Sequence, residues 1–454
     1  MRRAILVLAM LCLSFSAGAW EKNQLSVNTY LNTEFGFHLN EPDHLMKKYT
    51  SLQIKGTFDF TEDISLFFNL KKFYDCVYDV AGEYKHGSHR TATNTGNLWL
   101  REIFLDYKKA PIFVRAGRQQ VVWGTADGVR ILDCINPADN RYACLDDASE
   151  YRIPLWMLRL EFSPITDGNL QFLLIPDHQA NFNAGYGDVF VYRVANRPPP
   201  VLPPWVTYQV VDNLPEDGFH DPDFAFRWQH VINGWEYTLN YKYGREFYPS
   251  VTVRQIPFPP PPPPNPWTLL RSNNYQRVQI IGASFTKAIN TGRLSGLTIR
   301  GECAYTLDKP YPVGGDNNAT GNTTQNNFSY VLGLDKYLFT DLQVSIQFIQ
   351  SINQEDTAGA NHLLHPATLA PINKVETMAT IKLAKDFFHE RLKPEVLAVF
   401  GGNGDWRVSP RISYEVNDNL TIYGGIHYFA GRANTLFGEF EKSSMIYTGA
   451  TLAF

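Results

Sequence analysis

The sequence predicts an all-β protein, an antiparallel up-and-down transmembrane β-barrel of about 18 strands, with 16 as the alternative count. Three observations carry this prediction. Apolar and polar residues alternate along most of the chain, short and long connections separate the alternating segments in turn, and the last residue is an aromatic one, Phe454. Alternation with a period of two is typical of strands and not of helices.

Composition excludes several other classes of protein. The chain has 454 residues, of which 44% are hydrophobic and 19% charged, so it has enough apolar surface to fold. The mean hydropathy of -0.25 and the lack of a long apolar run after the N-terminus exclude a bundle of membrane-spanning helices. A net charge of -4 does not provide the excess of basic residues that is typical of nucleic-acid-binding proteins.

The first 19 residues have the pattern of a secretory signal peptide. Arg2 and Arg3 make the start positive, an apolar stretch follows over residues 4–15, and small residues at 17–19 form a cleavage site. The alternative is a single anchoring helix, for which the apolar stretch is short. We therefore expect a signal peptide over residues 1–19 and one barrel domain over residues 20–454, beginning at Trp20.

The alternation is clear within single strands. Trp156, Leu158 and Leu160, for example, alternate with Arg159 and Glu161, so one face suits lipid and the other suits water. Strands are expected near residues 24–39, 49–60, 64–73, 97–107, 111–117, 154–163, 169–176, 223–231, 235–243, 275–287, 293–305, 327–338, 342–350, 374–385, 392–400, 406–416, 420–430 and 443–454.

The connections between these strands differ in length in a regular way. Starting after the second strand, every other connection is short and turn-like, as at residues 61–63, 232–234 and 417–419, and those between are mostly long. Outer-membrane barrels have short periplasmic turns and long extracellular loops. A β-sandwich or a propeller also has alternating strands, but neither predicts this asymmetry.

The C-terminus indicates a cellular location. Residues 443–454 alternate and stop on Phe454, which resembles the C-terminal signature that the assembly machinery of Gram-negative outer membranes recognises. We therefore expect an outer-membrane protein that contacts lipid with its barrel exterior and the barrel assembly machinery through Phe454.

The polar faces of the strands indicate the lumen. Basic and acidic residues on these faces are nearly balanced in number, which favours a weakly selective aqueous channel or a wall braced by cross-strand pairs. The residues expected to face the lumen are Glu102, Arg115, Arg159, Glu161, Arg300, Glu302, Arg407 and Arg411.

One connection is distinctive enough to predict a loop that folds into the barrel. It spans residues 118–153, starts as a strand leaves the membrane, and is too long and too polar for a plain connector. A wide barrel leaves a water-filled channel, which an inward loop narrows. The candidates for the pore constriction are Arg118, Gln119, Asp127, Arg130, Asp133, Asn136 and Asp139.

Two cysteines of this loop are candidates for a disulfide. Cys134 and Cys144 close a short loop, and an exported chain meets an oxidising compartment. Free thiols are the alternative. Proline runs at residues 198–204 and 259–264 fall in predicted extracellular loops, where they favour stiff polyproline segments.

The same region resembles a known family. The pattern Gly117-Arg118-Gln119, Trp123-Gly124, Asp127 and Asn136-Pro137-x-Asp139, together with Leu100-Arg101-Glu102 and Arg300-Gly301-Glu302, is similar to proteobacterial outer-membrane barrel proteins with a domain of unknown function, number 1302. The resemblance covers most of the chain after residue 19. It implies a channel-like barrel related to porin-like and alginate-export-like channels.

The sequence leaves two functions open. Motifs for hydrolysis, nucleotide binding and haem attachment are missing from it, so we expect neither an enzyme nor a bound cofactor or metal. The first function is a porin-like channel for small polar solutes. The second is a scaffold whose barrel sheathes a periplasmic multihaem cytochrome in an electron conduit. The oligomeric state stays open.

Overall fold

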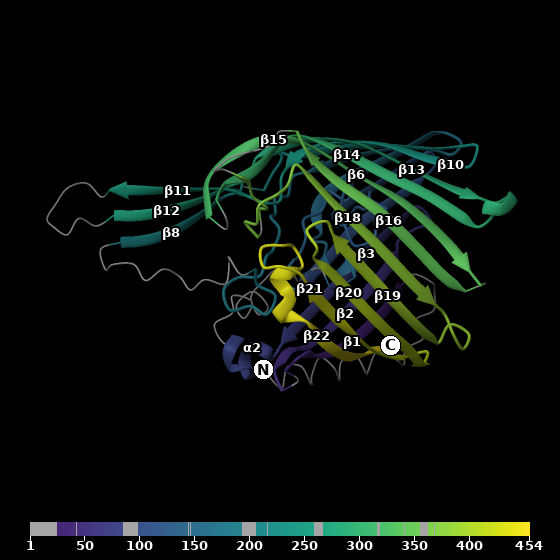
Figure 1. Ribbon diagram of the computed structural model, residues 1–454. Coiled ribbons are helices and arrows are strands. Elements are labelled where there is room, and N and C mark those ends of the chain that lie inside the picture. The colour runs from purple at the N-terminus through teal and green to yellow at the C-terminus, as the bar shows by residue number, and fades with distance from the viewer. Residues whose placement is uncertain are drawn as a thin grey trace.

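The computed structural model describes residues 25–41, 43–84, 99–143, 145, 147–192, 206–215, 217–257, 267–315, 318–339, 341–354, 362–366 and 368–454, so the expected signal peptide and Trp20 lie outside it. Eighteen of the described strands form one antiparallel barrel in which each strand pairs with the next along the chain (Figure 1). They are β1 (Leu25–His38), β2 (Leu45–Asp59), β3 (Ile64–Asp75), β4 (Leu100–Lys109), β5 (Ile112–Gln119), β6 (Leu155–Ile165), β7 (Gly168–Ile175), β9 (Asp223–Ile232), β10 (Trp235–Arg245), β13 (Arg277–Ile289), β14 (Leu297–Gly315), β15 (Asn318–Leu338), β16 (Leu342–Asn353), β18 (Val375–Lys385), β19 (Leu392–Gly401), β20 (Trp406–Asn417), β21 (Leu420–Ala430) and β22 (Met445–Ala453).

The first and last strands close the barrel. β1 pairs with β22 from Tyr30 opposite Ala453 to His38 opposite Met445. The backbone of the last residue continues the pairing, since the Phe454 N–H donates to the Thr29 carbonyl at 2.9 Å. Closure leaves no free edge in this sheet, which is what a sheet needs in order to span lipid. The predicted fold and the count of 18 strands are confirmed.

The two ends of the barrel differ, as the sequence predicts. Short turns at residues 60–63, 110–111, 166–167, 233–234 and 418–419 lie at one end, called here the short-turn end. Asn233 and Gly234 both have positive φ, 53° and 72°, which a two-residue hairpin turn between twisted strands requires. The other end carries the connections of residues 76–99, 120–154, 176–222, 246–276, 354–374 and 431–444 and is called the long-connection end.

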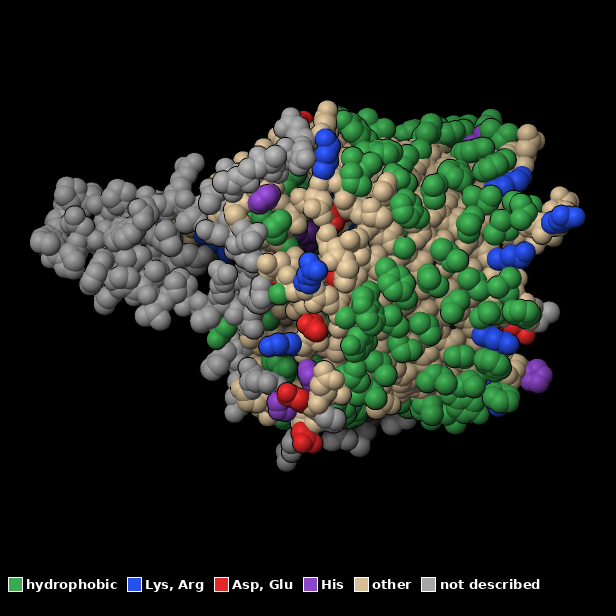
Figure 2. Space-filling view, viewed as in Figure 1, with side chains coloured by type: hydrophobic (Ala, Val, Ile, Leu, Met, Phe, Trp, Pro, Cys, Tyr) green, Lys and Arg blue, Asp and Glu red, His purple; other side chains and the backbone are tan. Residues whose placement is uncertain are grey.

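The exterior of the barrel is apolar. Trp156, Leu158 and Phe162 of β6 keep 46%, 39% and 42% of their surface exposed, whereas the intervening Arg159 and Glu161 face inward and pair with each other. Hydrophobic side chains cover the barrel wall, and Lys and Arg gather along its short-turn rim (Figure 2). An exposed apolar wall between polar rims fits a protein whose outer solvent is a bilayer.

The apolar core lies inside the barrel, where segments from the long connections pack against the wall. The first cluster, called the Trp123 cluster, contains Val121, Trp123, Leu132, Ile135, Leu155, Met157, Leu173, Ile175, Ala225 and Ala304. The second, called the Phe440 cluster, contains Met46, Val77, Tyr78, Tyr142, Val189, Phe190, Tyr192, Val399, Tyr423, Phe429, Phe437, Phe440, Met445 and Tyr447. The barrel is therefore partly filled.

The helices of the described chain are short. They are α2 (Val77–Val80), α4 (Ala148–Tyr151) and the 3-10 turns η2 (Gly82–Tyr84), η4 (Gly292–Leu294) and η5 (Gly438–Ser443). In the described ranges, none has the length and hydropathy that a membrane-crossing helix requires. The two-residue strand β17 (His362–Leu363) pairs with β14.

A second, three-stranded sheet extends away from the barrel at the long-connection end (Figure 1), and the sequence patterns do not predict it. It consists of β8 (Val206–Asn213), β11 (Ser250–Pro257) and β12 (Trp267–Asn274). β12 pairs in parallel with β8, which is more than 50 residues away in sequence, and local alternation carries no information about such pairing. The two proline runs lie outside the described residues.

Candidate functional site

The connection of residues 120–154 folds into the barrel, and Asn136 ties its two ends together. The Asn136 side chain is fully buried. Its Oδ1 accepts the Val121 N–H at 2.8 Å, and its Nδ2 donates to the carbonyls of Ile153 at 2.9 Å and Gln119 at 3.2 Å. Because one side chain bridges the outgoing and returning backbone, the root of the loop is closed against the wall.

Two apolar side chains anchor the loop further inside. The Trp123 indole donates to Gln171 Oε1 at 2.7 Å, and Leu132 lies against β13 at Gly282. A Cβ at Gly282 would lie 2.2 Å from Leu132 Cδ2, so only glycine leaves room for this contact. Both anchors belong to the Trp123 cluster.

The tip of the loop is latched to the wall by buried polar groups. Glu302 of β14 accepts the Thr125 N–H at 2.7 Å and the Leu132 N–H at 3.3 Å. Arg300 of the same strand donates to the Thr125 carbonyl and pairs with Asp127. Asp127 also accepts from Gln347 of β16 at 2.6 Å. The tip therefore reaches β14 and β16, far around the barrel from β5, where the loop starts.

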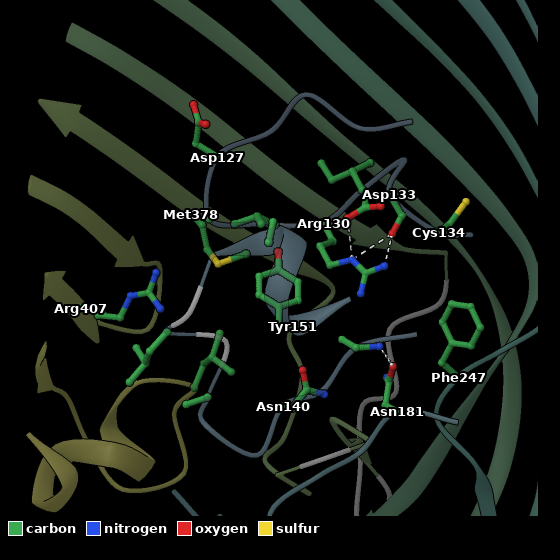
Figure 3. Close-up of a pocket in the computed structure, with 18 of the residues that line it drawn as sticks. Asp127, Arg130, Asp133, Cys134, Asn140, Tyr151, Asn181, Phe247, Met378 and Arg407 are labelled. Atoms are coloured by element: carbon green, nitrogen blue, oxygen red, sulfur yellow. Dashed lines mark hydrogen bonds and ion pairs between the residues drawn. The ribbon is translucent and has the colours of Figure 1, made fainter. Parts of the chain in front are cut away.

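The returning part of the loop carries a second ion-pair group. Arg130 Nε lies 3.1 Å and Arg152 Nε 2.8 Å from the same Asp133 oxygen. The Arg130 guanidinium also donates to the Asp133 carbonyl at 2.6 Å (Figure 3). These contacts stabilise the loop internally, and they neutralise the Asp133 carboxylate.

Two larger cavities lie between the inward segments and the wall in the part of the chain that the structure describes. The larger has a volume of about 670 Å³ and lies between the inward loop and the inner faces of two groups of strands, β10 and β13 to β15 on one side and β18 to β21 on the other. Figure 3 shows Arg407 across this cavity from Arg130 and Cys134. The smaller, of about 250 Å³, is lined mainly by β1, β2 and β3 and shares Leu145, Asp147, Arg411, His427 and Tyr447 with the larger. The shared residues place the two cavities next to each other.

The seven expected constriction residues divide into two groups. Asp127, Arg130 and Asp133 line the larger cavity. The other four lie elsewhere. Arg118 and Gln119, at the end of β5, donate to the carbonyls of Pro154 and Met157, each at 3.1 Å. Asn136 closes the loop root, and Asp139 pairs with Arg141 at 2.5 Å. These four hold the loop in place and are not among the residues that line the two cavities.

The eight residues expected to face the lumen are all on inner faces, where they have different roles. Arg407 and Arg411 line the larger cavity, Arg300 and Glu302 latch the loop, and Glu102 accepts the Gln120 N–H. Arg115 pairs with Asp106 at 2.7 Å, and Arg159 pairs with Glu161. Arg300 pairs with Asp335 at 2.7 Å as well as with Asp127.

The expected disulfide is not formed in the structure. Cys134 is a free thiol, as are Cys76 and Cys303, and Cys144 lies outside the described residues. Cys134 packs against the Trp123 cluster, whereas Ala143 and Leu145 on either side of position 144 pack against the Phe440 cluster. Closeness in sequence predicted the pairing, but the loop leads Cys134 to one cluster and Ala143 and Leu145 to the other.

We expect the Cys134 thiol to react slowly with maleimide at pH 7.5 in the folded protein. Burial raises the pKa of this thiol to about 11, and the thiolate is the reactive form. Peptide mapping after timed labelling measures the rate, and the unfolded protein is the control. Labelling of Cys134 at the rate of the unfolded chain, or its recovery in a disulfide with Cys144, would contradict the structure.

Several residues that shape the site were not predicted from the sequence. Residues 176–192 form a second inward segment, from which Val189, Phe190 and Tyr192 join the Phe440 cluster. Tyr142, also in that cluster, donates to Asp75 of β3 at 2.9 Å. Aromatic residues in long, otherwise polar connections were the available signal, because exposed loops rarely need them.

Fold and site together define a class: a transmembrane β-barrel whose lumen is narrowed by an inward-folded loop. The chain belongs to the family described as "Protein of unknown function (DUF1302)", which matches residues 1–379. A comparison with curated proteins found no match.

Comparison with solved structures found barrels of similar extent. A BenF-like porin from Pseudomonas fluorescens Pf-5 has a TM-score of 0.48 and 9% identity over 95% of this chain and 98% of its own. OccAB3 of Acinetobacter baumannii has a TM-score of 0.49 and 10% identity over 95% and 98%. The outer membrane protein OpdK of Pseudomonas aeruginosa has a TM-score of 0.49 and 8% identity over 95% and 98%.

Proposed function

We propose that this protein is a porin-like channel that lets small polar solutes cross the outer membrane of a Gram-negative cell. The observation that carries the proposal is the pair of adjacent cavities between the inward loop and the barrel wall. Barrels of 16 to 18 strands leave an aqueous lumen, and an inward loop limits the size of what passes. The charged residues on the inner faces suit polar solutes.

The cellular setting follows from the same proposal. The apolar exterior contacts outer-membrane lipid, and Phe454 at the end of β22 is available to the barrel assembly machinery. The signal peptide at residues 1–19 directs export. In this setting the short-turn end faces the periplasm and the long-connection end faces the outside.

The alternative, a barrel that sheathes a multihaem cytochrome, has less support. Such a partner needs an open lumen, but residues 120–154 and 176–192 lie inside the barrel and pack in the Trp123 and Phe440 clusters. The larger remaining cavity, of about 670 Å³, has the volume of a small-molecule site. We therefore favour the channel.

We expect the refolded protein to give discrete conductance steps in planar lipid bilayers and to let small sugars swell liposomes. Folding is checked beforehand by heat-modifiable migration on a gel, and heat-unfolded protein in the same detergent is the control. A folded and inserted barrel that gives neither conductance steps nor swelling would rule out the channel function.

A further inference from the structure

Three lysines lie on the lipid-facing side of the barrel, close to its short-turn end. They are Lys287 of β13, Lys336 of β15 and Lys385 of β18. Side chains two residues apart in a strand share one face. Lys336 follows Leu334 at this spacing, Lys385 follows Leu383, and both leucines are exposed on the apolar exterior. Lys287 lies opposite Ile299, which lies opposite Leu334, so it shares that face.

The sheet register spaces the three lysines along the short-turn rim. From Lys287 to Lys336 the sheet crosses two strands and moves two residues towards the turn, since Leu334 is level with Lys287. The step from Lys336 to Lys385 is the same, because Lys385 is level with Leu338 through Leu342. With the usual spacing of strands and residues, neighbouring lysines are roughly 12 Å apart. Each lysine can therefore meet a separate lipid.

Aromatic side chains mark the depth of these lysines in the membrane. The Lys287 Nζ lies 5.7 Å from the centre of a Trp235 ring, and the Lys385 Nζ lies 4.8 Å from the centre of the Phe387 ring. Aromatic residues at the ends of a barrel lie at the level of the lipid headgroups. A lysine stem follows the apolar wall and brings its ammonium group to this level. The three charges therefore lie where lipid phosphates lie.

The nearest groups on the lipid-facing side leave these charges uncompensated. In the described part of the chain, none of the three lysines forms an ion pair, and the Lys287 Nζ donates to a neutral group, the Asn233 carbonyl. The residues directly opposite the lysines on the strands between them are apolar. They are Leu297 and Ile299 of β14 and Leu342 and Val344 of β16.

The acidic residues of this part of the rim belong to the turns. The turns after β13, β15 and β18 contain three acids and two arginines, which are Asp341, Asp386, Glu390, Arg293 and Arg391. Asp386 and Glu390 interact electrostatically with Lys393, an inner-face lysine that also pairs with Glu415 at 2.7 Å. Even with every turn residue counted, five basic residues face three acidic ones. Lys and Arg accordingly dominate this rim in Figure 2.

We propose that Lys287, Lys336 and Lys385 bind the headgroups of anionic phospholipids in the inner leaflet of the outer membrane. The proposal goes beyond the channel function and does not depend on it. In the orientation proposed above, the short-turn end lies in the phospholipid leaflet. The apolar wall contacts the acyl chains while each ammonium group meets a phosphate. A lysine at an anionic membrane surface strengthens binding by about fivefold, the equivalent of about 1 kcal/mol.

The test measures lipid binding to the full-length refolded protein by native mass spectrometry. The protein is mixed in neutral detergent with equal amounts of phosphatidylglycerol and phosphatidylcholine that carry the same acyl chains. Both lipids have a phosphate, but the choline group cancels its charge in the second. We expect the wild type to retain about fivefold more phosphatidylglycerol, and Lys287→Gln, Lys336→Gln and Lys385→Gln together to bring the ratio close to one.

The matched control removes three lysine charges from inner faces, with Lys108→Gln, Lys382→Gln and Lys393→Gln together. Lys108 lies 3.5 Å from the Asp106 carboxylate, Lys382 lines the larger cavity and Lys393 pairs with Glu415. This variant has the same net charge as the first and should keep the wild-type ratio. Heat-modifiable migration on a gel confirms folding of each protein.

Three outcomes would overturn the inference. A folded wild type that retains the two lipids equally has no anionic preference, whatever the variants do. A lipid-facing variant that keeps the wild-type ratio would place the binding elsewhere. An equal fall in the control would mean that net charge, and not the position of these lysines, sets the preference. None of these outcomes bears on conductance, so the channel function is tested separately.

Discussion

Replacing residues 125–131 with two glycines is expected to raise the single-channel conductance by about threefold, because a barrel of this strand number has an aqueous lumen when nothing fills it. The replaced residues are the tip that Arg300, Glu302 and Gln347 hold against the wall. Trp123 and Leu132, the two apolar anchors, remain in place. Single-channel recording in planar bilayers measures the effect.

A milder variant tests whether the tip must be held against the wall in order to limit the conductance. Asp127→Asn keeps the tip but removes the charge that pairs with Arg300. It should give fluctuating conductance between the wild-type level and that of the shortened loop. If the shortened variant folds and conducts like the wild type, the tip does not limit the path, and the wall residues of the larger cavity set the conductance instead.

The largest loss of stability is expected for Asn136→Ala. This change leaves the Val121 N–H and the carbonyls of Gln119 and Ile153 without their partner at a fully buried position. Buried groups without partners are costly, and we expect the free energy of unfolding to fall by about 3 kcal/mol. Urea titration in detergent micelles measures this change.

An exposed asparagine provides the control for this prediction. Asn326 also makes two side-chain hydrogen bonds, to the Asp308 N–H at 3.0 Å and to Gln354 at 2.7 Å, but at exposed sites. Asn326→Ala should cost well under 1 kcal/mol, since water replaces the lost partners. Equal losses for the two variants would mean that the loop root does not depend on the Asn136 bridge.

The fold was predictable from the sequence because the two faces of each barrel strand contact two different solvents. Lipid on one face and the lumen on the other impose a period of two, as in β6, where the apolar residues are exposed and Arg159 and Glu161 pair inside. The strands β14 and β15 are longer than predicted, since beyond Thr306 the hairpin leaves the barrel and the alternation stops. There the two faces no longer meet different solvents.

The candidate site was predictable only in part. Its polarity and length predicted an inward loop over residues 118–153, and Asp127, Arg130 and Asp133 of this segment line the larger cavity. Arg118 and Asn136 are also polar residues of this loop, yet their side chains bind the backbone at the loop root. A polar side chain in a loop can face water or satisfy a buried carbonyl, and the sequence pattern is the same in both cases.

The sequence by itself determined the barrel architecture, a strand number of about 18 with 16 as the alternative, and the difference between the two ends, because these follow from local alternation and connection length. Only the tertiary structure decided where the loop goes. Its latch joins Asp127 to Arg300 and Gln347, which lie 173 and 220 residues away. Cys134 packs against the Trp123 cluster, whereas Ala143 and Leu145 pack against the Phe440 cluster. Contacts over such separations depend on how the barrel closes, which places distant strands around one lumen.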